Sequence, residues 1–152
     1  MWKPNWSGRD RTNLYIVPAS RYLEQELLAY QLYPSAVVID WRKKFLDEVR
    51  PNQRRLGLTV AGELDRLRRI TDSDAKVFSV INTEYLLGYF TEGERKQFWL
   101  SLWSRFPNLT GILIFTVLNS PVFLPDRLTL DLWGSTGRLA IAEKQADGAR
   151  LL

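Results

Sequence analysis

Short apolar runs alternate along this chain with longer segments of helical periodicity, and this alternation constrains the fold more than any other feature. The apolar runs are 13–17 (NLYIV), 35–40 (SAVVID), 76–87 (KVFSVINTEYLL), 112–118 (ILIFTVL) and 138–143 (RLAIAE). Apolar runs of this kind are typical of strands buried on both faces. Strands that alternate with helices form parallel sheets, because each helix carries the chain back to the starting edge. We therefore expect a three-layer α/β fold, with a mostly parallel sheet of about five strands and helices on both faces.

The segment after the first apolar run, SRYLEQELLAYQL, carries the spacing of an amphipathic helix. Leu23, Leu27 and Tyr30 recur at steps of four and three residues, which predicts that they form the buried face and that Gln25 points away from it. Ser20 stands where an N-cap is expected.

Three further segments have helical periodicity: 41–50 (WRKKFLDEVR), 60–70 (VAGELDRLRRI) and 91–106 (TEGERKQFWLSLWSRF). Thr59 is the expected cap of the second segment, and Thr91 with Glu94 three residues later has the pattern of a capping box. Residues 119–137, which are punctuated by proline and glycine, are expected to form an irregular crossover. The tail after 143 carries no strong signal.

The length of the chain predicts one domain over residues 1–152. Residues 1–12 are polar and basic, and we expect them to form a flexible or partner-binding arm. The chain has more tryptophans than a core of this size commonly needs, and tryptophan is enriched at binding hot spots. Trp99 and Trp103 are expected to pack against the sheet, whereas Trp2 and Trp6 lie outside the periodic pattern and are the candidates for a partner contact.

The composition excludes much of ordinary enzyme chemistry. The chain has no histidine and no cysteine, so it lacks the commonest general base, the commonest zinc ligand and any thiolate. We expect no catalytic residue, no metal and no cofactor. No apolar run approaches the roughly eighteen residues of a membrane span, and no apolar signal core is present, so we expect a cytoplasmic protein without a membrane partner.

Ligands of parallel sheets bind at the carboxyl ends of the strands, where Ser20, Arg21, Asn82 and Glu84 are the candidates. A phosphate loop requires glycines and a lysine, and PASRYLEQ has neither. We favour Ser20 as a helix cap, Arg21 as a solvated side chain, and Asn82 and Glu84 as partners of turn and helix-start backbone groups. The competing interpretation is a residual anion or nucleotide contact.

The second quarter of the chain is rich in basic residues, which would form a basic patch if they share a face. They are Arg42, Lys43, Lys44, Arg50, Arg54, Arg55, Arg66, Arg68 and Arg69. Such a patch would neutralise the phosphates of DNA or RNA and would make binding salt-dependent. The competing interpretation is a set of solvated helix faces.

The order of these elements resembles the small P-loop-type protein of bacterial BREX phage-exclusion systems, called BrxF, over nearly the whole chain. The more specific part is INTEYLL, in which Asn82, Glu84, Leu86 and Leu87 match that family's segment after the third strand. Ile81 stands where the family has an acidic residue, and the phosphate loop is absent at VPASRYL. The resemblance implies a P-loop-NTPase-like fold that has lost its phosphate loop.

Three functions follow from these observations. The leading hypothesis is a non-catalytic P-loop-like subunit or adaptor of a prokaryotic multiprotein assembly in anti-phage defence, with other protein subunits as partners. The first alternative is a nucleic-acid-binding component that uses the basic residues between Arg42 and Arg69. The second is a residual NTP-binding enzyme that uses Ser20, Arg21 and Glu84.

Overall fold

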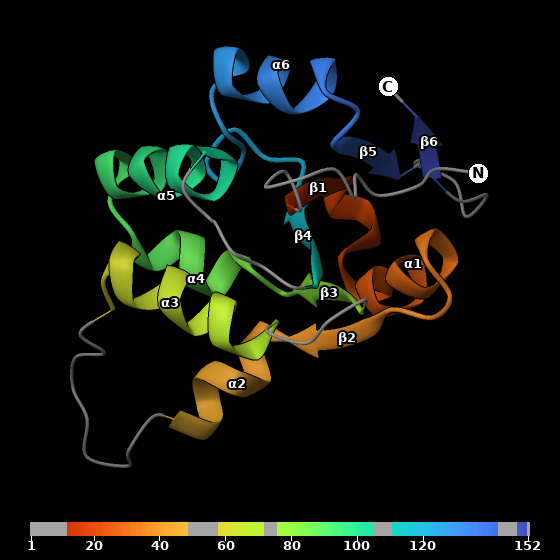
Figure 1. The fold of residues 1–152 in the computed structure, drawn as a ribbon, viewed down its shortest axis with the longest axis horizontal. Coiled ribbons are helices and arrows are strands. Elements are labelled where there is room, and N and C mark those ends of the chain that lie inside the picture. The colour runs from red at the N-terminus through yellow and green to blue at the C-terminus, as the bar shows by residue number, and fades with distance from the viewer. Residues whose placement is uncertain (1–11, 49–57, 72–75, 105–110, 143–148, 152) are drawn as a thin grey trace.

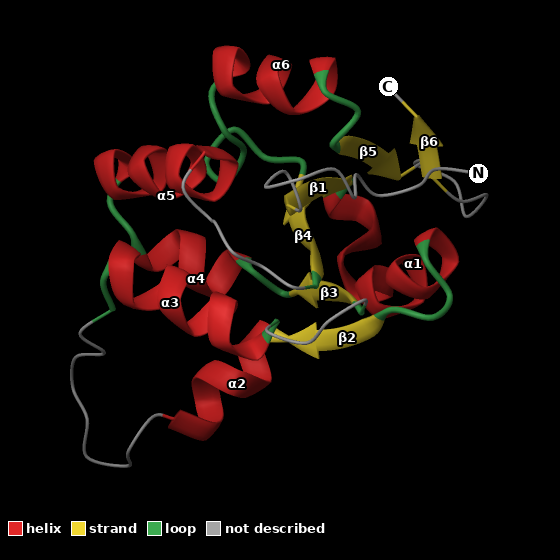
Figure 2. Cartoon of the chain, viewed as in Figure 1, coloured by secondary structure: helices red, strands yellow, loops and turns green. Residues whose placement is uncertain are grey.

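The computed structural model of this chain describes residues 12–48, 58–71, 76–104, 111–142 and 149–151 (Figures 1 and 2). The strands are β1 (Thr12–Val17), β2 (Val37–Asp40), β3 (Val77–Ile81), β4 (Ile112–Leu118), β5 (Leu139–Ala142) and β6 (Ala149–Leu151). The helices are the 3₁₀ helix η1 (Ala19–Glu24) and the α-helices α1 (Gln25–Leu32), α2 (Trp41–Glu48), α3 (Val60–Ile70), α4 (Glu84–Tyr89), α5 (Glu92–Ser104) and α6 (Arg127–Ser135).

The strands form one sheet in the order β2-β3-β4-β1-β5-β6. β1 to β5 pair in parallel, and β6 runs antiparallel to β5. β1 lies between β4 and β5, with Leu14 aligned to Phe115 on one side and to Leu139 on the other. The predicted α/β fold with a mostly parallel sheet is therefore confirmed, and the carboxyl ends of β1 to β5 meet at one edge of the sheet.

The two faces of the sheet belong to different hydrophobic clusters, because successive side chains of a strand point to opposite faces. Leu14 and Ile16 of β1 pack in the cluster that includes residues of α3, α4, α5 and α6. Tyr15 and Val17 pack in the other cluster, together with Leu28 of α1. Figure 1 shows α1 on one side of the strands and α3 to α5 on the other, so the three predicted layers are present.

Two predicted helix starts have the expected hydrogen bonds. The Thr59 hydroxyl accepts from the backbone N–H of Gly62 at 3.0 Å at the start of α3. Thr91 and Glu94 form the capping box before α5: each side chain accepts from the other residue's N–H, at 3.0 and 3.2 Å. These local signals therefore determine where both helices begin.

Three elements were missed in the sequence. β3 ends at Ile81, where the apolar run meets the polar Asn82, but the rest of the run 76–87 forms α4, which begins at Glu84 and was not predicted. The crossover contains α6, whose N-cap Asp126 accepts from the N–H of Thr129 at 2.9 Å. The tail contributes β6. Asp126 between a proline and an apolar segment was a usable start signal for α6.

The described tryptophans belong to the core. Trp41, Trp99 and Trp133 are buried, and the ring of Trp103 stacks edge-on against Trp133 at 5.3 Å. The Arg138 guanidinium lies 4.0 Å from the ring centre of Trp103 and 4.8 Å from that of Trp133. The predicted packing of Trp99 against the sheet is confirmed by its edge-on contact with Phe115 of β4 at 5.4 Å, whereas Trp103 is half-buried and packs against Trp133 of α6. These tryptophans give no support to a partner surface.

The amino end of β1 begins inside the segment expected to be an arm. Thr12 is the first residue of β1 and is buried, and its hydroxyl donates to the Leu102 carbonyl at 2.9 Å. Trp2 and Trp6, the predicted partner contacts, lie outside the described residues. Within the described ranges, no helix combines the length and the apolar character that crossing a membrane requires.

Candidate functional site

The turn after β1 differs from the predicted helix start. Pro18, with φ −62° and ψ 143°, flanks η1 directly, and no side chain caps this helix. Ser20 is exposed and lies inside η1, so its prediction as an N-cap is wrong. The extended backbone of Pro18 starts the helix at Ala19, one residue before the serine could cap it.

Arg21 is buried and not solvated, which corrects the favoured interpretation of this residue. Its φ of −113° and ψ of 25° depart from helical values, its side chain is only 3% exposed, and its Nε donates to Glu24 Oε2 at 2.9 Å. This hydrogen bond lowers the pKa of Glu24. Burial raises the pKa of Tyr15 to about 12, and the nearby charge of Arg21 offsets part of that rise.

Asn82, directly after β3, adopts the left-handed conformation with φ 57°. Its N–H donates to Gln25 Oε1 at 3.0 Å, and its Oδ1 accepts from Gln25 Nε2 at 3.2 Å. The Asn82 side chain therefore bonds to the Gln25 side chain and not to backbone groups of the turn, and Gln25 points inward; both findings differ from the prediction. The left-handed backbone conformation is commonest in glycine and asparagine. Asn82 can therefore end β3 in this conformation at a small cost in conformational free energy.

Glu84 is the first residue of α4, and its Oε1 accepts from the Tyr22 hydroxyl at 2.6 Å, so its prediction as a partner of helix-start backbone groups is wrong. Burial and this hydrogen bond to Glu84 raise the pKa of Tyr22. Glu84 Oε2 is buried without a hydrogen-bond partner among the described residues. The segment after β1 is thus joined to the end of β3 through two side-chain pairs, Tyr22–Glu84 and Gln25–Asn82.

The structure brings only some of the predicted strand-end candidates together. Asn82 and Glu84 belong to this network, whereas Arg21 turns toward Glu24 and Tyr15, and Ser20 is exposed. Tyr22 and Gln25 were missed as members, because their helical spacing gave no sign that they face the sheet edge.

A hollow of about 140 Å³ opens beside the network. Its lining residues are Tyr22, Leu23, Gln25, Glu26, Asp40, Arg42, Ile81 and Asn82. A second hollow of about 390 Å³ shares Glu26, Asp40 and Ile81 with it and extends along β2 to Lys43 and Lys44. Asp40 Oδ1 accepts from the Lys43 N–H at 3.2 Å, so this carboxylate caps α2. No three acidic side chains of the described residues gather as a metal ion would require.

The side chains that were predicted to form the buried face of the first helix are exposed in the structure. Leu23 is 92% exposed, Leu27 is 51% exposed and Tyr30 is 42% exposed. The buried positions are Gln25, Leu28, Ala29 and Leu32. Leu28 and Leu32 also have helical spacing, and this second set packs in the buried cluster with Tyr15 and Val17. We call Leu23 of η1 together with Leu27 and Tyr30 of α1 the α1 row.

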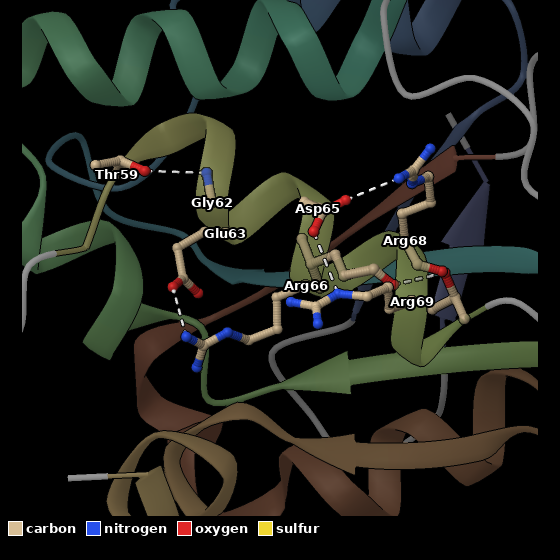
Figure 3. Close-up of polar contacts among 9 residues, drawn as sticks. Thr59, Gly62, Glu63, Asp65, Arg66, Arg68 and Arg69 are labelled. Atoms are coloured by element: carbon tan, nitrogen blue, oxygen red, sulfur yellow. Dashed lines mark hydrogen bonds and ion pairs between the residues drawn. The ribbon is translucent and has the colours of Figure 1, made fainter. Parts of the chain in front are cut away.

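The predicted basic patch is partly neutralised on α3 (Figure 3). Asp65 pairs with both Arg68, at 2.8 Å, and Arg69, at 3.2 Å, and Glu63 pairs with Arg66 at 3.5 Å. Each pair lies within one helix at spacings of three or four residues. Three arginines of α3 therefore share two carboxylates of the same helix, so α3 keeps part of its positive charge.

On α2 the basic side chains remain accessible. Arg42, Lys43 and Lys44 are all exposed, and the Arg42 guanidinium lies 5.1 Å from the ring centre of Tyr85. Arg50, Arg54 and Arg55 lie outside the described residues. The structure therefore describes two parts of the predicted patch. The basic side chains of α2 are exposed, and the arginines of α3 form ion pairs.

Glu63 is the most perturbed carboxylate of this region. It is buried in the first turn of α3, and burial raises its pKa to about 7 despite the Arg66 contact. Its Oε2 has no hydrogen-bond partner among the described residues.

Comparison of this chain with protein-family models, with curated proteins and with solved structures gave no match. Because one fold serves many unrelated functions, the function has to be argued from the site itself.

Proposed function

We propose that this chain is a non-catalytic P-loop-like subunit or adaptor of a prokaryotic protein assembly. One observation carries the proposal: the segment after β1 directs its polar side chains inward and its apolar side chains outward. Tyr22 and Gln25 bond to the end of β3, while the α1 row faces solvent.

The inward side of this segment supports a non-catalytic role. A P-loop protein follows its first strand with glycines, so that backbone N–H groups approach the phosphates. Here the central strand β1 is followed by Pro18 and by η1, which has no glycine. The side chains of Tyr22 and Gln25 bridge the strand ends themselves, so the protein fills part of the crevice in which a nucleotide would bind.

The outward side supports a role as a subunit. A leucine that is 92% exposed gains little from the fold of its own chain, and three large apolar side chains at helical spacing form a typical recognition surface. The anti-phage part of the proposal rests on the resemblance of INTEYLL to the BREX protein.

Titration calorimetry with ATP, with and without Mg²⁺, tests the non-catalytic part. We expect no magnesium-dependent heat of binding, because no glycine-rich loop follows β1. Micromolar ATP binding that requires Mg²⁺ and is lost in Glu84→Gln would overturn the proposal in favour of the residual NTP-binding enzyme.

Purification from the native host tests the subunit part. The wild-type chain should co-elute with a stoichiometric protein partner, and Leu27→Asp should lose that partner. Leu128→Asp is the matched control, because Leu128 is 79% exposed on α6, away from the α1 row. If both variants retain the same partners, or none co-elutes with the wild type, the α1 row is not the subunit contact.

Nucleic-acid binding is the second candidate, and the exposure of Arg42, Lys43 and Lys44 on α2 favours it. DNA and RNA titrations at rising salt test it, with Lys43→Ala/Lys44→Ala as the variant and the exposed Lys76→Ala as the control. If α2 binds phosphates, the double variant should reduce the salt slope by about 1 to 2. Absence of binding at low salt would remove this candidate.

A further inference from the structure

We infer that one exposed face of the molecule binds single-stranded DNA or RNA, with the tyrosines of α4 stacking on unpaired bases and the cations in the first turn of α2 binding phosphates. The residues of this face, which we call the α2–α4 face, are Arg42, Lys43, Lys44, Tyr85 and Tyr89. The inference goes beyond the proposed subunit role. Within the second candidate function, it names the form of the nucleic acid and the residues that contact its bases.

Two tyrosines of α4 present ring surface to solvent. Tyr85 is 37% exposed and Tyr89 is 41% exposed. They stand at positions i and i+4 of one helix, so their Cβ atoms are neighbours about 5 to 6 Å apart on the same side of α4. Aromatic rings at such a surface can each receive one base of a nucleic-acid strand, because every base has a flat face that stacks.

Three cations of α2 lie next to these rings. The Arg42 guanidinium lies 5.1 Å from the centre of the Tyr85 ring, which joins the first turn of α2 to α4. Lys43 and Lys44 follow directly and are exposed. Among the described residues, no carboxylate forms an ion pair with any of these three cations, whereas the arginines of α3 do form such pairs. The cations of α2 are therefore available to phosphate groups beside the tyrosines.

The position of the two lysines does not favour the helix that carries them. The N-terminus of a helix has a partial positive charge, which favours acidic side chains in the first turn. The first turn of α2 has no acidic residue and contains Lys43 and Lys44 instead. Residues that break a local rule in this way are expected at functional surfaces. A bound phosphate would reduce the repulsion between the lysines and the helix end.

Acidic residues also border the α2–α4 face, and they limit where phosphates can lie. Asp40 caps α2 by accepting from the Lys43 N–H, and Glu84 accepts from a tyrosine hydroxyl, so both carboxylates already have partners within the protein. Glu26 is exposed and lines the hollow of about 390 Å³ together with Asp40 and the two lysines. The acidic residues 47–48 lie in the last turn of α2. Because the hollow carries both signs of charge, we place the phosphates at its rim, beside the tyrosines, and not inside it.

The exposed rings favour a single strand over a duplex. The faces of the bases are covered by their neighbours in a duplex, whereas the bases of a single strand can stack on aromatic side chains. Cations alone would bind either form through its phosphates. An acidic protein segment would also bind the cations, but its binding would not depend on an aromatic ring at Tyr85. The tyrosines therefore distinguish the inferred ligand from these two alternatives.

Fluorescence anisotropy with four labelled probes tests the inference. The probes are oligo(dT) and oligo(U) of about twelve nucleotides, a duplex of the same length and a polyglutamate peptide. At low salt, oligo(dT) or oligo(U) should bind at least about tenfold more tightly than the duplex and the peptide, and the tighter of the two strands identifies DNA or RNA as the ligand. No binding of either strand, or equal binding of the duplex or the peptide, would overturn the inference.

Paired substitutions at Tyr85 test the stacking. Tyr85→Leu removes the ring and should weaken strand binding by about fivefold or more, whereas Tyr85→Phe keeps the ring and should change it by less than about twofold. Tyr30→Leu is the matched control, because Tyr30 is similarly exposed on α1, and it should leave binding unchanged. Thermal unfolding curves show which variants are folded, and Tyr89→Leu with Tyr89→Phe repeats the comparison if Tyr85→Leu is not. Equal losses in the leucine and phenylalanine variants would mean that no base stacks on α4.

The salt dependence of strand binding tests the lysines. Lys43→Ala/Lys44→Ala should reduce the salt slope by about 1 to 2, because each phosphate contact with a single strand contributes about 0.7 to the slope. Lys76→Ala is the control, since Lys76 is exposed at the amino end of β3, and it should keep the wild-type slope. A slope that the double variant leaves unchanged would contradict the placement of phosphates on α2.

The α2–α4 face, the second candidate function and the subunit role can fail separately. If neither strand binds but a native partner depends on Leu27, the subunit role stands and the inference is wrong. If strand binding depends on the lysines but not on the ring of Tyr85, the second candidate stands and the inference is wrong. If strand binding depends on both and no native partner depends on Leu27, the inference stands and the subunit role fails.

Discussion

Several buried polar atoms lack hydrogen-bond partners among the described residues. Whether a substitution raises or lowers the free energy of unfolding depends on whether the removed group had such a partner. The Tyr15 hydroxyl is fully buried without a hydrogen bond, whereas the Tyr22 hydroxyl donates to Glu84. A buried polar group without a partner costs free energy, and a bonded one leaves an unsatisfied group behind when it is removed. The two tyrosines should therefore respond in opposite ways to loss of the hydroxyl.

We predict that Tyr15→Phe leaves the free energy of unfolding unchanged or raises it by up to about 1 kcal/mol, because an unpaired hydroxyl is removed. Tyr22→Phe should lower it by about 1 to 2 kcal/mol, since Glu84 loses its donor. Urea denaturation of the two variants and the wild type measures both. A larger loss in Tyr15→Phe than in Tyr22→Phe would contradict the assignment of these contacts.

Glu63 predicts a pH dependence of stability. Its pKa is about 7 in the folded chain against 4.5 in an unperturbed glutamate, so the folded state holds the proton more tightly. The stability that the protonated form contributes is present below about pH 4.5 and is lost as pH rises through about 7. Glu63→Gln should therefore stabilise the protein at pH 8, by about 1 to 3 kcal/mol, more than at pH 5.

Denaturant unfolding of wild type and Glu63→Gln at both pH values measures this difference. The exposed Glu26→Gln is the control, and it should keep the wild-type pH dependence. If Glu63→Gln also keeps that dependence, Glu63 is ionised in the folded state throughout this range.

At the scale of elements, one turn joins the segment after β1 to the end of β3. Asn82 contributes to this turn in two ways: its backbone is left-handed, and its side chain accepts a hydrogen bond from Gln25. These contributions can be separated, because glycine tolerates the backbone conformation but offers no acceptor.

We predict that Asn82→Ala lowers the free energy of unfolding by about 2 kcal/mol, through the loss of the acceptor and through strain at positive φ. Asn82→Gly should lose about 1 kcal/mol less, because it avoids the strain. Thermal and urea unfolding measure both variants. Equal losses would mean that the conformation of the turn contributes nothing.

The sequence predicted elements well wherever local signals agreed with tertiary packing. α3 has its predicted bounds, and the Thr59 cap and the box of Thr91 and Glu94 form as expected. The inward and outward faces of α1 were reversed, because Leu23 and Leu28 belong to two equally good apolar spacings. Tertiary packing decides between them, because Leu28 packs with Tyr15 and Val17 of β1 whereas Leu23 is left exposed. The Tyr22–Glu84 contact joins residues 62 positions apart, which periodicity cannot detect.

At the scale of the whole molecule, Arg138 connects elements that are distant in the chain. Its Nε donates to the Thr12 carbonyl at 2.7 Å, its Nη2 to the Thr12 hydroxyl and to the Trp103 carbonyl, and its guanidinium lies over Trp103 and Trp133. β1, α5, α6 and the start of β5 therefore meet at one buried cation.

We predict that Arg138→Lys lowers the free energy of unfolding by about 2 to 4 kcal/mol, because an ammonium cannot reproduce the planar fork of donors or stack on the indole rings. Arg69→Lys on the exposed side of α3 is the control and should change stability by less than about 0.5 kcal/mol. Urea denaturation followed by tryptophan fluorescence measures both. A loss in Arg138→Lys as small as that of the control would show that the buried site needs only a positive charge.

The strand order also limits how this chain folds during synthesis. β1 leaves the ribosome first, yet both of its neighbours in the sheet, β4 and β5, lie beyond residue 111. Until Ile112 and the residues after it have emerged, the apolar side chains of β1 have no adjacent strand, whereas β2 and β3 can already pair. Such distant pairing slows folding and leaves apolar segments open to wrong contacts. A nascent chain that stops before β4 is therefore the form of this protein most in need of a chaperone.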